Sequence, residues 1–316
     1  MKRAVLIALL LAAAPAPLLA QDGGARGVVA FTTASSDDST PARDRSLLLD
    51  AARAAIAPIT DVPALVQPIG HTAEVAFRNR PPPPGMPARD PMTARGQIVT
   101  RALDLSKAPD ASGAYPGRDE GAPVIVFVND PTALFIDGSN FEDVSDHHFS
   151  LPRDVQTASD GQVIPQGLWD VHVFSRAGRS PIIPVTQAER LERLIKEAEA
   201  ELDGNRAVPQ LADLYGGWVQ ARRRTLDALS AGERTAQACD AAIVDPDTAF
   251  GPCLPGDPGF VRINPDYFDR SLPRSTIQLL TIAVPNEDHA RSEPTARIIR
   301  DVILQADLQA VRKHVH

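Results

Sequence analysis

The sequence predicts an α+β fold in which a largely antiparallel sheet is covered by an antiparallel helix pair and a C-terminal helix. Two observations favour this class. Patterns of strand type and helix type come in blocks along the chain and do not alternate strictly, as they would in an α/β fold. In addition, no glycine-rich phosphate loop follows a predicted strand, so a nucleotide-binding fold has no support.

The clearest predicted strand is 123–128, a run rich in β-branched residues that is typical of a strand covered on both faces. Residues 168–185 are predicted to form a hairpin, with arms at 168–174 and 181–185 joined by a polar turn. Further strands are expected within five other stretches, namely 62–78, 97–105, 133–136, 260–263 and 277–284.

Stripes of apolar residues at helical spacing indicate the predicted helix pair. Thr186 and Glu189 have the spacing of a capping box at the start of the first helix, which ends at 203–205. Pro209 suits the first turn of the second helix, because its missing N–H needs no partner there. Two more helices are expected, at 47–56 and, closing the chain, at 297–311.

The first 20 residues have the pattern of a cleavable secretory signal peptide. Lys2 and Arg3 precede an apolar run that is too short to span a bilayer, and the small residue Ala20 precedes the expected cleavage point. No later stretch is long and apolar enough to span a membrane. We therefore expect a soluble, periplasmic or secreted protein without a transmembrane anchor.

The remaining chain divides by composition into three parts. Residues 21–46 are small and polar and are predicted to be a flexible leader. Residues 47–91 form a small N-terminal segment that ends in a proline-rich loop, where four consecutive prolines favour an extended backbone. Residues 92–316 are predicted to be the main α+β domain, and the sequence leaves open whether the N-terminal segment packs on it.

The charge balance excludes nucleic acid as the expected partner. Without Lys2 and Arg3, the predicted mature chain keeps 30 basic residues against 40 acidic ones, a net charge of −10. Neutralisation of phosphates supplies most of the affinity for nucleic acids, and an acidic chain without a basic stripe lacks it. The only basic run is 222–224, in a helical pattern, where a solvated face or surface ion pairs are expected.

The two cysteines, Cys239 and Cys253, are predicted to form a disulfide. Exported chains meet an oxidising compartment, and the segment between the two residues is rich in turn residues. On the chain-entropy model a bond across a loop of this size stabilises the fold by roughly 3 kcal/mol. Two free buried thiols or a metal pair are the alternatives, and the second lacks further ligands at suitable spacing.

Asp143, Asp146, His147 and His148 are the first candidates for chemistry, because imidazoles and carboxylates are good ligands for zinc and similar metals. The triplet 146–148 resembles the signature of the DHH phosphoesterases. The resemblance covers three residues, and the upstream aspartates of that family have no counterpart here, so we assign no family. We favour a polar loop over a metal site.

Asp170 and His172 are the second candidates. Residues two apart on a strand share a face, so the carboxylate could raise the basicity of the imidazole, as a hydrolase would need. Trp169, Val171 and Val173 would then face the core. We favour a plain polar face for this pair over a catalytic role.

These observations predict a non-catalytic periplasmic binding or interaction module. Its partner is an unknown protein or small ligand, bound at the exposed sheet face or at the proline-rich loop. Motifs of common hydrolases, such as G-x-S-x-G, S-x-x-K and H-E-x-x-H, do not occur. The alternative is a metal-dependent hydrolase in which the 143–148 cluster, with or without His172, binds a divalent metal such as zinc that activates water. No other cofactor is expected.

Overall fold

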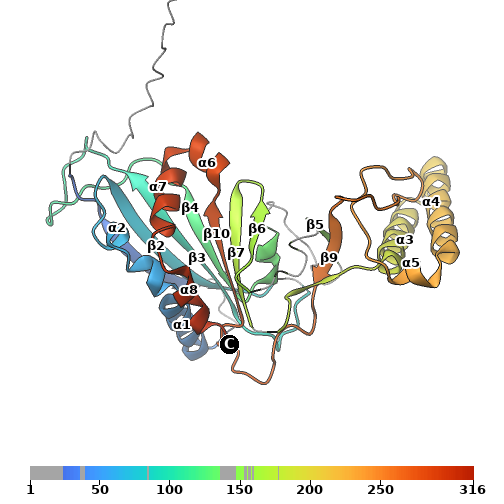
Figure 1. The fold of residues 1–316 in the computed structure, drawn as a ribbon, viewed down its shortest axis with the longest axis horizontal. Coiled ribbons are helices and arrows are strands. Elements are labelled where there is room, and N and C mark those ends of the chain that lie inside the picture. Colours follow the sequence, from blue (N-terminus) through green and yellow to red (C-terminus); the bar gives the residue numbers. More distant parts are fainter. Residues whose placement is uncertain are drawn as a thin grey trace, which may run out of the picture.

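The large sheet has seven strands in the order β1-β2-β3-β4-β10-β7-β6 (Figure 1). Every neighbouring pair is antiparallel except β1 with β2. The computed structural model describes residues 24–35, 40–83, 85–135, 147–152, 155, 158, 160–176 and 178–316. In spatial order the strands are β1 (Val29–Ser35), β2 (His71–Arg80), β3 (Thr93–Ala102), β4 (Pro123–Val128), β10 (Leu279–Pro285), β7 (Trp169–Ser175) and β6 (Val163–Gln166).

Three helices, together with Leu65 of the four-residue α2 (Pro63–Val66), cover one face of the large sheet (Figure 1). Their apolar side chains meet alternate strand residues in a first core, to which Ile56 and Ile299 contribute from the helices and Val126 from β4. The helices are α1 (Ala42–Thr60), α7 (Pro294–Ile303) and α8 (Leu308–Val311). The predicted class, with a mostly antiparallel sheet packed on helices that include the C-terminal one, is confirmed.

A second core lies on the opposite face of the large sheet. Ile125 and Phe127 of β4, which alternate with the residues of the first core, belong to it together with Val171 and Val173 of β7. Its cover includes side chains of a small sheet with the order β5-β9-β8. The small strands are β5 (Phe149–Leu151), β9 (Gly259–Ile263) and β8 (Ile182–Pro184).

The predicted hairpin over 168–185 is wrong. Its two arms exist as β7 and β8, but β7 pairs with β6 and β10 in the large sheet, whereas β8 pairs with β9 in the small one. Both edges of β7 are therefore occupied, and its hairpin partner is the preceding strand, β6. The polar segment at 175–180 carries the chain from one sheet to the other.

The predicted helix pair forms but does not cover the large sheet. Helices α3 (Gln187–Gly204) and α4 (Pro209–Ala228) pack on each other and stand beyond the small sheet, with the short α5 (Ala231–Thr235) beside them (Figure 1). The reason is local: α3 begins directly after β8, a strand of the small sheet. Its start is the predicted capping box, in which the Thr186 hydroxyl accepts from the Glu189 N–H.

Residues 133–135 of the predicted strand 133–136 are not a strand, and residue 136 lies outside the described residues. Residues Pro131–Leu134 form a 3-10 helix, η2, whose N-cap Asp130 accepts hydrogen bonds from the N–H and hydroxyl of Thr132. This capping and the proline in the first turn favour a helical turn over an extended backbone. The other short elements are α2 (Pro63–Val66), α6 (Glu287–Ser292) and the 3-10 helix η4 (Arg312–His314).

The described residues of the N-terminal third are part of the main body. Strand β1 and the start of α1 lie within the stretch 21–46, which was predicted to be a flexible leader. Strands β2 and β3 flank the proline-rich loop and pair over ten residues, so the segment 47–91 joins the same sheet as the chain that follows. The predicted signal peptide, 1–20, lies outside the described residues. No described helix is long and apolar enough to cross a membrane.

Candidate functional site

Only part of the predicted metal cluster can be located. Asp143 and Asp146 lie outside the described residues, whereas His147 and His148 directly precede β5. The His147 ring lies 4.7 Å from the Phe149 ring, centroid to centroid, and its Nδ1 is 3.5 Å from an Arg193 nitrogen. Among the described residues, no three histidine, cysteine, aspartate or glutamate side chains gather closely enough to bind a metal ion.

His148 lines a hollow of about 480 Å³ between α3 and β9. Two of the acidic side chains that line this hollow pair with arginines: Glu189 with Arg262 at 3.1 Å and Glu197 with Arg193 at 2.7 Å. Burial, aided by the guanidinium groups of Arg193 and other arginines, lowers the pKa of His148 to about 4. The imidazole is therefore neutral at neutral pH, as a metal ligand must be, but its arginine neighbours disfavour a cation there.

Asp170 and His172 share one face of β7, as their spacing predicts, and both are half-buried. Burial lowers the pKa of His172; the Asp170 carboxylate opposes this shift and the Arg300 guanidinium of α7 adds to it. Val171 and Val173 point into the second core. The pair thus lies on the helix-covered side of the sheet, which limits access for a substrate.

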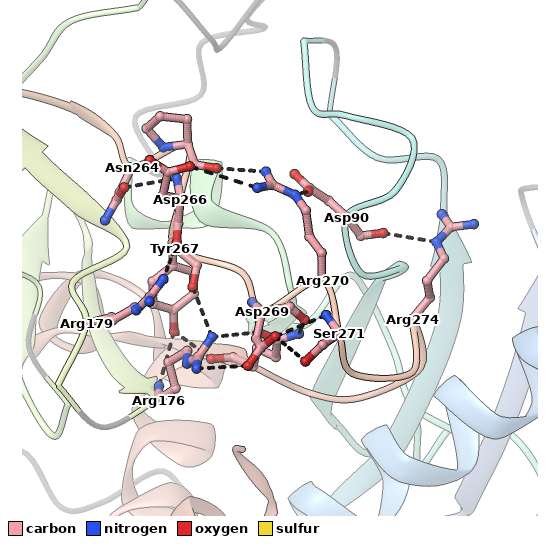
Figure 2. A network of polar contacts seen from close by, with 12 residues as sticks. Asp90, Arg176, Arg179, Asn264, Asp266, Tyr267, Asp269, Arg270, Ser271 and Arg274 are labelled. Carbon is pink, nitrogen blue, oxygen red and sulfur yellow. Dashed lines mark hydrogen bonds and ion pairs between the residues drawn. The ribbon is translucent and has the colours of Figure 1, made fainter.

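A polar network anchors the end of the proline-rich loop (Figure 2). Asp90, only 4 % exposed, accepts from the Nε of Arg270 at 2.6 Å, and its backbone carbonyl accepts from the Nε of Arg274 at 3.0 Å. The Met92 N–H in turn donates to the Arg274 carbonyl. The loop is therefore tied to the chain segment between β9 and β10.

The same network continues around the buried Tyr267 (Figure 2). Its hydroxyl donates to the Gln278 carbonyl at 2.6 Å and accepts from the Arg176 N–H. The Arg176 guanidinium lies 3.4 Å from the Asp269 carboxylate and also donates to the Tyr267 carbonyl. The arginines of the network bind carboxylates or backbone carbonyls of neighbouring loops, so the network braces these loops against one another.

The best candidate site lies on the second face of the large sheet, at its β1–β3 end. Arg78 and Arg80 of β2 and Arg95 of β3 share this face, and we call them the arginine face. Arg78 lies directly opposite Arg95 in the antiparallel register. No helix of the described chain covers this part of the sheet.

Beside the arginines the sheet surface is hollowed. Small residues leave a depression of about 170 Å³, which is lined mainly by Thr32, Ala34, Ala76, Arg78, Arg95 and Gln97. The Arg95 guanidinium lies over the Phe127 ring, 5.3 Å from its centroid, where the second core ends. The depression thus combines an apolar floor with cationic walls.

No ion pair neutralises the arginine face within the described part of the chain, because none of its three guanidinium groups lies within 4.0 Å of a carboxylate oxygen there. Burial, followed by the charges of Arg80 and Arg78, lowers the pKa of Arg95, and Asp130 opposes this. Desolvation raises the pKa of the partly buried Asp130 carboxyl group.

Sequence reasoning missed the arginine face. The predicted strand stretch 62–78 includes Arg78 but ends before Arg80, although the i, i+2 spacing of these two arginines is that of one strand face. The basic run that the sequence shows directly is the one at 222–224. In the structure Arg222 is buried and donates to the Leu194 carbonyl, whereas Arg223 pairs with Glu199 on the surface, as predicted.

The predicted disulfide is confirmed. Cys239 and Cys253 are bonded, with their Cα atoms 5.7 Å apart. The bond closes the loop that follows α5, and Cys239 also pairs with Gly259 at the start of β9. It therefore fastens this loop to the small sheet.

Comparison with known proteins identifies no relative: no family model, curated protein or solved structure matches the chain.

Proposed function

We propose that the protein is a non-catalytic binding module whose arginine face binds the carboxylate groups of a partner. The observation that carries this proposal is the set of three arginines on an uncovered sheet face without a carboxylate partner in the described chain. Like charges directly opposite each other on neighbouring strands destabilise a sheet. Proteins are expected to keep an arrangement that lowers stability in this way at functional sites, and here a ligand would supply the missing negative charge.

Carboxylates are the favoured ligand chemistry because a guanidinium group binds them through two parallel hydrogen bonds. A nucleic acid would also carry negative charge, but the chain as a whole has a net charge of −8 and would repel a long polyanion. A ligand with a few carboxylates, small enough to meet only the arginine face, suits this charge distribution better.

Calorimetric titration with a capped hexaglutamate peptide tests the proposal. We expect binding that weakens at high salt, and Arg78→Ala should reduce the affinity by about threefold to tenfold, since a charged pair at a half-exposed site contributes on that scale. Arg224→Ala, on the exposed side of α4, is the matched control with the same change in net charge. Equal affinity of the two variants would overturn the proposal.

We also infer that the protein is exported and works in the periplasm or outside the cell. The signal-peptide pattern of residues 1–20 and the disulfide, which persists in oxidising compartments, both support this. N-terminal sequencing of protein recovered from the periplasm or the medium should begin near Gln21. Recovery of the intact N-terminus from the cytoplasm would contradict the inference.

A metal-dependent hydrolase is the second candidate, supported by the neutral His148 imidazole in a hollow of suitable size. We rank this function second because the arginines near His148 disfavour the binding of a cation. Elemental analysis decides the matter: a stoichiometric metal, such as zinc, that is lost in both His147→Ala and His148→Ala would establish the site. A purified protein without metal, with unchanged melting temperature in both variants, would exclude it.

A further inference from the structure

Strand β1 is an open edge of the large sheet. It stands at the end of the strand order, and no other described strand pairs with its outer side. Edge strands are usually protected from pairing by charges, prolines or short length. The opposite edge strand, β6, is protected in this way, with four residues that include Pro165. The seven residues of β1 contain neither a proline nor a charge.

The register shows which backbone groups of β1 are available. The Val28 carbonyl accepts from the Ala73 N–H at 3.1 Å, and Val29 lies opposite Ala73 in the parallel ladder. Backbone groups alternate in direction along a strand, so the even-numbered residues of β1 point toward β2. The N–H and C=O groups of Val29, Phe31 and Thr33 therefore point outward, away from the sheet.

The two faces of this edge differ in chemistry. On the arginine face β1 carries only small side chains, and Arg78 lies opposite Ala34, so its path across β1 is open. A new strand would lie about 10 Å from β2, within the combined reach of an arginine and a glutamate. On the helix-covered face, Val29 and Phe31 are 48 % and 50 % exposed, and Arg53 lies over the Phe31 ring.

We propose that an extended segment of a partner protein, with alternating acidic and apolar residues, adds to β1 as an eighth strand. Its backbone pairs with Val29, Phe31 and Thr33, its acidic side chains meet the arginine face, and its apolar side chains cover Phe31. Strand addition of this kind takes affinity from backbone hydrogen bonds and specificity from alternate side chains. The proposal rests on the function proposed above and names its partner class.

Charge complementarity favours such a partner over a second copy of this chain. Two copies paired through β1 would bring two arginine faces to neighbouring positions, where their charges repel. A partner with glutamates on that face removes the repulsion. Light scattering at the concentrations used for titration checks this point, since a concentration-dependent dimer without peptide would favour the second copy and contradict our choice.

The test compares two capped octapeptides with the same charge, one alternating glutamate and valine and the other alternating glutamate and proline. The added strand pairs antiparallel to β1, so its apolar residues lie opposite Val29, Phe31 and Thr33 and supply the N–H groups that face β1. In the second peptide these residues are prolines, which have no N–H to donate. We expect the glutamate–valine peptide to bind at least about tenfold more tightly. We also expect it to slow the hydrogen exchange of the Phe31 and Thr33 amides. Equal binding of both peptides would reject strand addition but keep the arginine face as a site, whereas binding of neither would reject both.

Variants of β1 give the second arm of the test. Thr33→Pro removes an outward N–H and no bond to β2, and prolines are tolerated on edge strands in this orientation. This variant should keep the wild-type melting temperature, and its affinity for the glutamate–valine peptide should be about fivefold to tenfold lower. If Thr33→Pro fails to fold, Phe31→Ala replaces it in the test, because the Phe31 side chain is half-exposed. This second variant should also bind the glutamate–valine peptide with lower affinity. Unchanged affinity in a folded variant would overturn the proposal.

Discussion

At the scale of single residues, the cross-strand pair of Arg78 and Arg95 is the feature that most departs from ordinary sheet chemistry. Like charges directly opposite each other on antiparallel strands lower stability. Burial of the Arg95 guanidinium costs further stability, and it lowers the pKa of this group. The contact of the guanidinium with the Phe127 ring offsets part of this loss of stability. Residues that break a local rule in this way are expected at functional sites.

Replacing one member of this pair should therefore separate stability from binding. Arg78→Glu places a carboxylate opposite Arg95 and should raise the free energy of unfolding by about 0.5–1 kcal/mol while it abolishes hexaglutamate binding. Urea unfolding measures the first effect and calorimetric titration the second. Arg224→Glu is the control for net charge, and a destabilised Arg78→Glu would show that Arg78 has a structural partner.

The titration of His148 makes a second prediction at this scale. Its folded pKa of about 4 lies below the unfolded value of 6.5, so the unfolded chain binds the proton more readily between these two values. The stabilising contribution of the neutral imidazole is present above pH 6.5 and is lost as the pH falls toward 4. His148→Gln should therefore flatten the fall of stability between pH 6.5 and 4. If the unfolding free energy of the variant falls with pH as steeply as that of the wild type across this range, the assigned pKa shift is contradicted.

At the scale of elements, α3 depends on its capping box because it begins at the small sheet and carries the helix pair away from the body. The Thr186 hydroxyl accepts from the Glu189 N–H, and the Glu189 carboxylate accepts from the Thr186 N–H at 2.8 Å. Glu189 also pairs with Arg262 of β9, which joins the helix to the small sheet.

Thr186→Ala should lower the free energy of unfolding by about 1 kcal/mol, the usual cost of losing an N-cap. Ser230→Ala is the matched control, because Ser230 and Glu233 form a second capping box at the five-residue α5, where both side chains are exposed. We expect a smaller loss there, since few contacts depend on that helix. Urea unfolding of both variants gives the comparison, and a larger loss for Ser230→Ala would be the contrary result.

At the scale of the whole molecule, the large sheet is packed on both faces over only part of its width. Strands β4, β10 and β7 contribute side chains to a core on each side, whereas among the described residues the β1–β3 end has helices on one side and the arginine face on the other. The network around Asp90 and Tyr267 ties together the loops at the border between these two parts (Figure 2). The arginine face is thus built on a braced scaffold.

Removal of Asp90 should loosen this brace. Asp90→Ala leaves the Arg270 guanidinium with less compensation, which should cost about 2 kcal/mol of unfolding free energy and make the proline-rich loop more sensitive to proteolysis. Asp266→Ala is the control, because Asp266 lies 4.0 Å from the same guanidinium but is 87 % exposed. Cleavage of the loop at the same rate in both variants would argue against a bracing role.

Features that depend only on neighbouring residues were predictable from the sequence. The capping box at Thr186, the strand at 123–128 and the shared face of Asp170 and His172 all follow from local spacing. The disulfide also followed, because the chain contains only two cysteines and they flank a short loop. Such features need only the alternation of a strand, the turn of a helix or the closing of a loop.

Which elements meet depends on long-range contacts. Strand β7 pairs with β6 and β10 and leaves β8 to the small sheet, because partners compete for two edges and local patterns do not rank them. The helix pair stands away from the large sheet because α3 follows β8 directly. The arginine face arises because the register sets Arg78 opposite Arg95, across the proline-rich loop. A one-residue shift of that register would turn Arg95 to the other face, so the site depends on non-local pairing.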